Sequence, residues 1–114
     1  MVKLSGGFLR RFGDDLMFWC PGCKRAHVVN INHARGRPAW AWNGNETKPT
    51  LRPSVRCYTP ERIDSKGKKH PQFTLCHLFL VNGEIQFLGD CAHELKGKKV
   101  PLQPIDDDYG GLEG

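Results

Sequence analysis

Residues 73–89 read FTLCHLFLVNGEIQFLG and carry the strongest fold signal in the chain. Two apolar-rich runs, 73–81 and 84–89, flank Asn82-Gly83, a dipeptide typical of a two-residue β-hairpin turn. Such a turn fixes the register, so Leu80 is expected opposite Ile85 and Leu78 opposite Phe87. One face of this hairpin is then wholly apolar, and we expect it to face the core. It consists of Cys76, Leu78, Leu80, Ile85 and Phe87.

A second hairpin is expected around Cys20-Pro21-Gly22-Cys23, which lies between the strand-like runs 16–19 and 26–31. Two cysteines separated by two residues can bind one tetrahedral metal ion. An odd count of five cysteines argues against a framework of disulfides. The segment therefore predicts a zinc knuckle at the tip of a hairpin.

A structural zinc ion requires four Cys or His ligands, and this turn supplies only two. If the 84–89 strand continues, Cys91 and His93 share one face with Cys76. We therefore predict a zinc site formed by Cys20, Cys23, Cys76 and Cys91. His93 or His77 could replace one of the last two, although the hairpin register directs His77 to the opposite face.

Two further candidates are weaker. Cys57 has no partner at ligand spacing and is expected not to bind the metal. His27 follows Cys23 by four residues and could bind the metal or contact one of its ligands. A histidine on the strand surface is the favoured interpretation.

The rest of the chain favours a small, mostly β domain of two or three hairpins, with at most one short helical turn near residues 92–95. The segment 48–55 contains two prolines, which predict an extended edge or loop rather than a central strand. Residues 59–72 are polar and are expected to form a mobile loop. We predict a single domain over 1–105 and an acidic tail over 106–114.

Charge is unevenly distributed along the chain. The net charge is +5, but residues 1–105 hold all 17 basic and 8 of the 12 acidic residues, a net charge of +9. The favoured interpretation is a solvated basic surface. The alternative is a surface that binds an acidic protein or nucleic acid. The chain has neither a long apolar stretch nor a signal-peptide pattern, so we expect no membrane contact and a location in the bacterial cytoplasm.

The run Trp40-Ala41-Trp42 alternates with period two and lies near several arginines, including Arg52. Exposed indoles beside basic groups can stack nucleobases and hold phosphates. Trp40, Trp42 and Arg52 are thus candidate residues for binding single-stranded nucleic acid. Packing of at least one indole in the core is the favoured alternative.

Catalysis is disfavoured by the motifs that are missing. A catalytic zinc keeps an open position and a general base, for which Asp90, His93 and Glu94 are candidates. His93-Glu94 is not followed by the second histidine of the helical metalloprotease motif, and the deaminase pattern is also absent. A Cys–His nucleophile pair, Cys91 with His77 or Cys76 with His93, is conceivable, but metal ligation is the commoner fate of such thiols.

The order of these motifs resembles a family of small phage and prophage proteins of unknown function, often labelled as ammonia monooxygenases. The resemblance covers about residues 17–102 and includes the 49–55 segment PTLRPSV, Cys76-His77 and the 83–93 segment GEIQFLGDCAH. This family is similar to BubE-type proteins of bacterial ubiquitin-like operons, which are predicted metal-dependent peptidases. The resemblance implies functional positions at Cys20, Cys23, Cys76, His77, Cys91 and His93, with Asp90 close by.

These observations favour a phage- or prophage-encoded module whose zinc is mainly structural and which binds a macromolecule, with a protein as the expected partner. The alternative is a peptidase-like zinc hydrolase that uses Asp90, His93 or His77 around the metal. A further alternative is a protein that binds single-stranded nucleic acid.

Overall fold

A computed structural model describes residues 2–106, which form eleven strands in three antiparallel sheets. The predicted mostly β fold is confirmed. The acidic tail predicted over 106–114 lies outside the described residues, except for Asp106. No helix among the described residues is long and apolar enough to cross a membrane.

The first sheet contains the predicted hairpin around the Cys-Pro-Gly-Cys turn. Its strand order is sequential: β1 (Val2–Lys3), β2 (Leu9–Phe12), β3 (Asp15–Cys20) and β4 (Arg25–Asn30). In the register of β3 and β4, Phe18 lies opposite His27 and Cys20 opposite Arg25. Because side chains alternate along a strand, this register turns His27 inward with Val29 and leaves Val28 exposed.

The second sheet contains the Asn82-Gly83 hairpin. Its order is β11 (Lys99–Pro101), β10 (Glu84–Phe87), β9 (Phe73–Val81), β6 (Leu51–Thr59) and β5 (Ala41–Trp42). The predicted register is confirmed, with Leu80 opposite Ile85 and Leu78 opposite Phe87. Cys76 and the other apolar residues of the predicted core face are all buried.

The proline-containing segment differs from its prediction. Leu51–Thr59 is a strand that pairs with β9 along its length, whereas β5 pairs only with Leu51 and Arg52. The strand tolerates Pro53 because the ladder is irregular there: Leu51 opposes Leu80 and Val55 opposes Leu78. β6 therefore advances four residues while β9 advances two, and such a bulge can redirect side chains.

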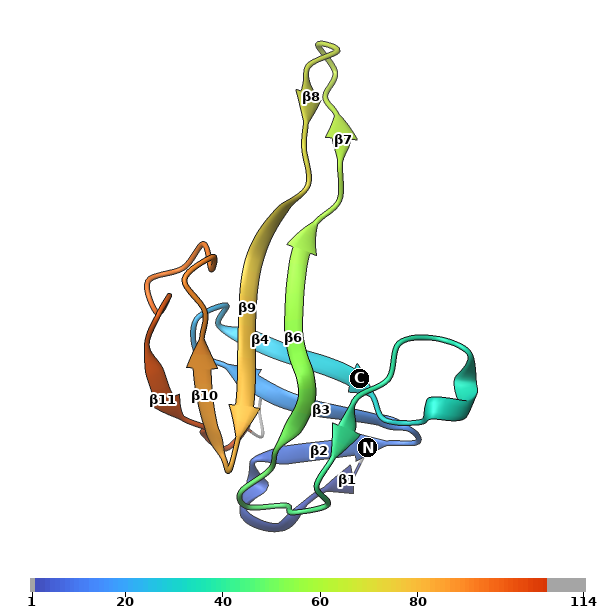
Figure 1. Ribbon diagram of the computed structural model, residues 1–114, viewed down its shortest axis with the longest axis vertical. Helices are drawn as coiled ribbons and strands as arrows, with labels where there is room; N and C mark the ends of the chain where they lie inside the picture. The colour runs from blue at the N-terminus through green and yellow to red at the C-terminus, as the bar shows by residue number, and fades with distance from the viewer. Residues whose placement is uncertain (1, 107–114) are drawn as a thin grey trace.

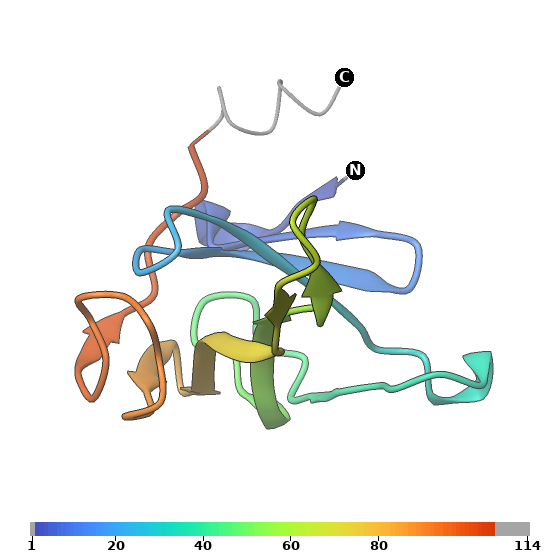
Figure 2. The same ribbon diagram turned by 90° about the horizontal axis from the view of Figure 1, so that it is seen from above.

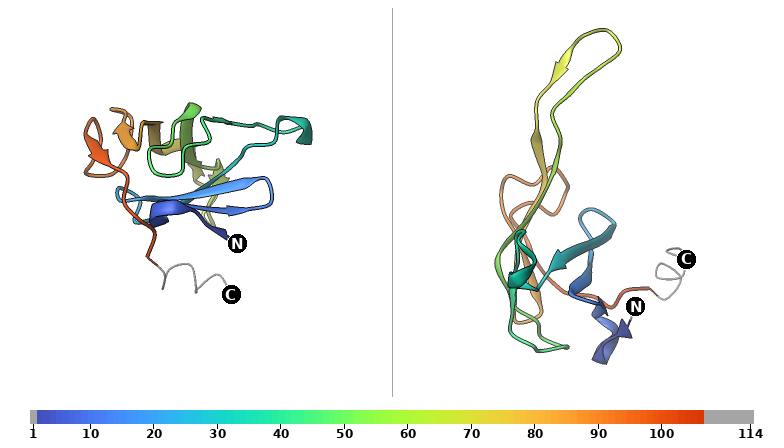
Figure 3. Two further views of the ribbon diagram at one scale, coloured as in Figure 1. Left: turned by 90° about the horizontal axis from the view of Figure 1, so that it is seen from below. Right: turned by 90° about the vertical axis from the view of Figure 1, so that its right-hand side faces the viewer.

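The two larger sheets form two layers that pack face to face (Figure 2; Figure 3, left). Their inner faces join in one apolar core that contains residues of both layers, among them Leu9, Leu16 and Phe18 of the first sheet and Leu51, Leu78 and Leu80 of the second. This shared core places the Cys-Pro-Gly-Cys turn of the first sheet against the middle of β9.

Residues expected to form a loop instead continue β6 and β9 as a narrow arm that projects from the body (Figure 1; Figure 3, right). Its strands are β7 (Arg62–Ile63) and β8 (Lys69–His70). The expected helical turn near 92–95 is a series of hydrogen-bonded turns, and short 3-10 turns occur at Ser5–Gly7 and His33–Arg35.

Candidate catalytic triad and metal centre

Strand β9 presents two kinds of chemistry on its two faces. Cys76 points inward to the core and is buried, whereas the next residue, His77, points to the opposite face. The inner face carries a cluster of metal-binding residue types, and the outer face carries a chain of hydrogen-bonded polar side chains.

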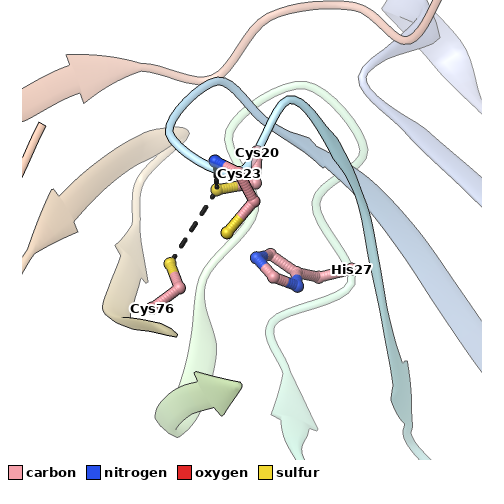
Figure 4. A group of neighbouring side chains, drawn as sticks. All are labelled: Cys20, Cys23, His27 and Cys76. Atoms are coloured by element: carbon pink, nitrogen blue, oxygen red, sulfur yellow. Dashed lines mark hydrogen bonds between the residues drawn. The ribbon is translucent and has the colours of Figure 1, made fainter. Parts of the chain in front are cut away.

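The inner cluster consists of Cys20, Cys23, His27 and Cys76, whose ligand atoms all lie within 4.8 Å of one another. Figure 4 shows them converging from the Cys-Pro-Gly-Cys turn, β4 and β9. The sulfurs of Cys20 and Cys76 are 3.9 Å apart. Tetrahedral zinc with Zn–S bonds of about 2.3 Å would place two sulfurs about 3.8 Å apart. The spacing therefore fits one shared tetrahedral ion.

The protonation of the three thiols is strongly linked. A hydrogen bond with Cys76, opposed by burial, lowers the pKa of the Cys20 thiol to about 4. The same hydrogen bond, together with burial, raises the pKa of Cys76. Burial and the neighbouring Cys20 charge raise the pKa of Cys23 to about 11. Each thiolate in the cluster thus opposes the formation of the next, whereas a divalent cation would stabilise all three.

His27 provides an independent test of whether the cluster fits a metal. Its side chain is buried, with 7% of the residue exposed, and its Nε2 has no hydrogen-bond partner among the described residues. A buried polar atom of this kind is costly unless it is satisfied, and an imidazole nitrogen is a common zinc ligand. The prediction of a surface histidine is wrong because the β4 register turns His27 inward.

Cys76, Cys91 and His93 form a second group with metal-binding spacing. His93 Nδ1 accepts a hydrogen bond from the backbone N–H of Leu95 at 3.2 Å. In a neutral imidazole the proton is then on Nε2, which lies 3.3 Å from Cys76 Sγ. In this arrangement His93 donates to the Cys76 sulfur, as groups around metal ligands commonly do.

The ring of His93 also packs against Gly22 of the Cys-Pro-Gly-Cys turn. A Cβ added to Gly22 would come within 2.3 Å of the His93 ring. We expect Gly22→Ala to displace this imidazole and to lower the free energy of unfolding by about 1–3 kcal/mol, measured by urea denaturation. Gly89→Ala is the matched control, because a Cβ there meets nothing within 4 Å. Equal stability of the two variants would contradict this packing.

On the outer face, Ser54, His77 and Asp90 form a chain of two hydrogen bonds. Ser54 Oγ lies 2.9 Å from His77 Nε2, and His77 Nδ1 lies 3.1 Å from Asp90 Oδ2. When Nδ1–H donates to the carboxylate, Nε2 is free to accept the hydroxyl proton of Ser54. The side chains of His77 and Asp90 are 24% and 51% exposed, so the chain of hydrogen bonds is open to solvent.

Three different elements position these groups. Ser54 lies in the irregular part of β6, where its backbone carbonyl accepts a hydrogen bond from the Trp40 indole at 3.1 Å. His77 is in the middle of β9. Asp90 lies in the turn segment that follows β10, whose backbone is tied to β9 by hydrogen bonds from Leu88 to His77 and from Ala92 to Leu75.

The sequence candidates are thus divided between two sites. Cys20, Cys23 and Cys76 belong to the inner cluster, and Cys91 and His93 form the second group with Cys76. His77 belongs to the outer face. Cys57 belongs to neither metal-binding group among the described residues; its sulfur accepts from Arg25 at 3.2 Å. Trp40 and Trp42 are partly buried against the core, while Arg52 is exposed.

Ser54 was not among the sequence candidates. Its signal was weak because the surrounding run LRPSV resembles no nucleophile motif and its histidine and aspartate lie 23 and 36 residues away. The feature that could have indicated Ser54 was the position of His77 on the outer face of the hairpin. The chain has only three serines. If the 51–55 run pairs with the 73–81 run, Ser54 is the serine that comes close to His77.

The hydrogen bonds join Ser54, His77 and Asp90 in the order in which a Ser–His–Asp triad is joined. The family described as "Bacterial ubiquitination-like system serine protease (BubE)" matches residues 6–88, and the chain belongs to this family. The match includes Ser54 and His77 and ends just before Asp90. No curated protein and no solved structure matches the chain.

Proposed function

We propose that this protein is a serine hydrolase that cleaves polypeptide substrates, with Ser54 as nucleophile, His77 as general base and Asp90 as the group that orients His77. The observation that carries the proposal is the pair of hydrogen bonds, 2.9 Å and 3.1 Å, that joins the three side chains in the order of a catalytic triad. The family description, a serine protease, supports a polypeptide as the substrate.

The roles follow from proton positions. Ser54 Oγ attacks the scissile carbonyl as its proton moves to His77 Nε2, and a tetrahedral intermediate forms. His77 then gives this proton to the leaving amine as its bond to the carbonyl carbon breaks, which leaves the acyl-enzyme. Water hydrolyses the acyl-enzyme with His77 again acting as base. The Asp90 carboxylate keeps the Nδ1 proton in place and stabilises the imidazolium that forms.

We further propose that the inner cluster binds one structural zinc ion through Cys20, Cys23, His27 and Cys76. Three thiolates and one imidazole are a common ligand set for structural zinc, and four protein ligands leave no open position. Such an ion supplies folding free energy and links the β3–β4 hairpin to β9.

This ligand set argues against the alternative of a zinc hydrolase. A catalytic zinc needs an open position beside a general base. His77 and Asp90 lie instead on the opposite face of β9, bonded to each other and to Ser54. The groups suited to proton transfer are therefore assembled around a serine and not around the metal cluster.

A fluorophosphonate probe tests the proposed nucleophile, because an activated serine displaces fluoride and becomes covalently bound to phosphorus. We expect one labelled position, Ser54, identified by mass spectrometry of a protease digest. His77→Ala should abolish the labelling because the base is lost, whereas the matched variant His33→Ala should retain it. Labelling at Ser5 or Ser65, or no labelling of the folded protein, would contradict the proposal.

A further inference from the structure

We propose that Cys91 is a positioning residue that holds His77 and Asp90 in place, and that it is not a metal ligand. The proposal rests on the proposed serine hydrolase function, which it deepens by naming the device that aligns the triad. Cys91 is nearly fully buried and directly follows Asp90 in the chain.

The first argument is the pair of contacts between Cys91 and the backbone of His77. Cys91 Sγ accepts a hydrogen bond from the His77 N–H at 3.2 Å and donates one to the His77 carbonyl at 3.2 Å. Strand β10 ends at Phe87. Beyond it the Leu88 N–H still donates to the His77 carbonyl, and the thiol supplies the acceptor for the His77 N–H. The thiol thus gives a hydrogen-bond partner to the partly buried N–H of the proposed catalytic histidine.

The second argument is the path of the segment that carries Asp90. The Leu88 N–H donates to the His77 carbonyl at 2.9 Å, and the Ala92 N–H donates to the Leu75 carbonyl at 3.0 Å. These two bonds anchor the turn on both sides of Asp90. The Cys91 thiol adds a third attachment between them, directly beside the carboxylate that must reach His77 Nδ1.

The third argument concerns the metal. Cys20, Cys23, His27 and Cys76 already supply four ligand atoms within 4.8 Å of one another. The Cys91 thiol is therefore available to hydrogen-bond with the backbone of His77, although it lies beside Cys76.

The test compares Cys91→Ala, Cys91→Ser and the control Cys57→Ala, which removes a cysteine on the other side of Cys76. Three quantities are measured: zinc per chain after dialysis, kcat and KM for p-nitrophenyl acetate, and the far-downfield Nδ1 proton of His77 by NMR. We expect Cys91→Ala to retain one zinc ion, to lose the downfield proton and to lower kcat about 10- to 100-fold with little change in KM. Cys91→Ser keeps a donor and an acceptor and should recover most of the rate.

Loss of zinc in Cys91→Ala but not in Cys57→Ala would overturn the proposal, because Cys91 would then be a ligand. An unchanged kcat and downfield proton in Cys91→Ala would also overturn it. If the unmodified protein lacks hydrolase activity, the serine hydrolase proposal fails, whereas zinc content and the His77 proton still decide the role of Cys91.

Discussion

Replacement of Ser54 by alanine is expected to reduce kcat/KM for p-nitrophenyl acetate by about 10⁴-fold or more. The hydroxyl is the only group of the proposed triad that can form the acyl-enzyme, so its loss removes the covalent pathway and not merely an assisting contact. The fold should be unaffected, because the Ser54 atom bonded by Trp40 is the backbone carbonyl, which alanine retains.

The matched control is Ser65→Ala, which removes a hydroxyl from the turn between β7 and β8 in the projecting arm. Its kcat/KM should equal that of the unmodified protein. A circular dichroism melt establishes that both variants are folded to the same extent. If Ser54→Ala retains more than about a tenth of the activity, the triad is not the catalytic device, whatever its geometry.

Removal of the proposed zinc ion is expected to have the largest effect on stability. Structural zinc binding supplies folding free energy directly, and a small domain has a total stability of only about 5–15 kcal/mol. Dialysis against a chelator, or Cys20→Ser, should therefore cost on the order of 5 kcal/mol and broaden or abolish the unfolding transition. The near-ultraviolet circular dichroism of the three tryptophans provides the measurement.

Two histidine variants identify the fourth ligand. His27→Ala should lose zinc and stability together, because its Nε2 is the buried nitrogen that has no other partner among the described residues. His93→Ala should retain zinc with an affinity lowered about 10- to 100-fold, as expected for a group that donates to the Cys76 sulfur. The reverse order of these effects would assign the fourth ligand to His93.

The hairpins of the fold could be predicted because their signals are local. Asn82-Gly83 sets both the turn and the register, and the alternation of Cys76, Leu78 and Leu80 identifies the buried face. The strand 51–59 was harder, because its prolines oppose regular pairing. Only the irregular ladder between Leu51 and Val55, which depends on the partner strand β9, accommodates them.

The group of residues that could bind a metal was predicted in part. Spacing along the chain identified Cys20 and Cys23, and the hairpin register correctly separated His77 from Cys76. The inward turn of His27 depends on how β4 pairs with β3 and packs over the second sheet. A histidine in a short strand gives no sign in the sequence of which face will be buried.

The sequence by itself determined the two hairpins, the pair of cysteines in the Cys-Pro-Gly-Cys turn and the position of His77 on the face opposite Cys76, because each depends on residues that are close in the chain. Only the tertiary structure decided which of these residues come together in one site. Ser54, His77 and Asp90 come from β6, β9 and the turn after β10, and their 2.9 Å and 3.1 Å contacts exist only when the sheet is assembled. Cys20 and Cys76 likewise approach to 3.9 Å only because two separate sheets share one apolar core.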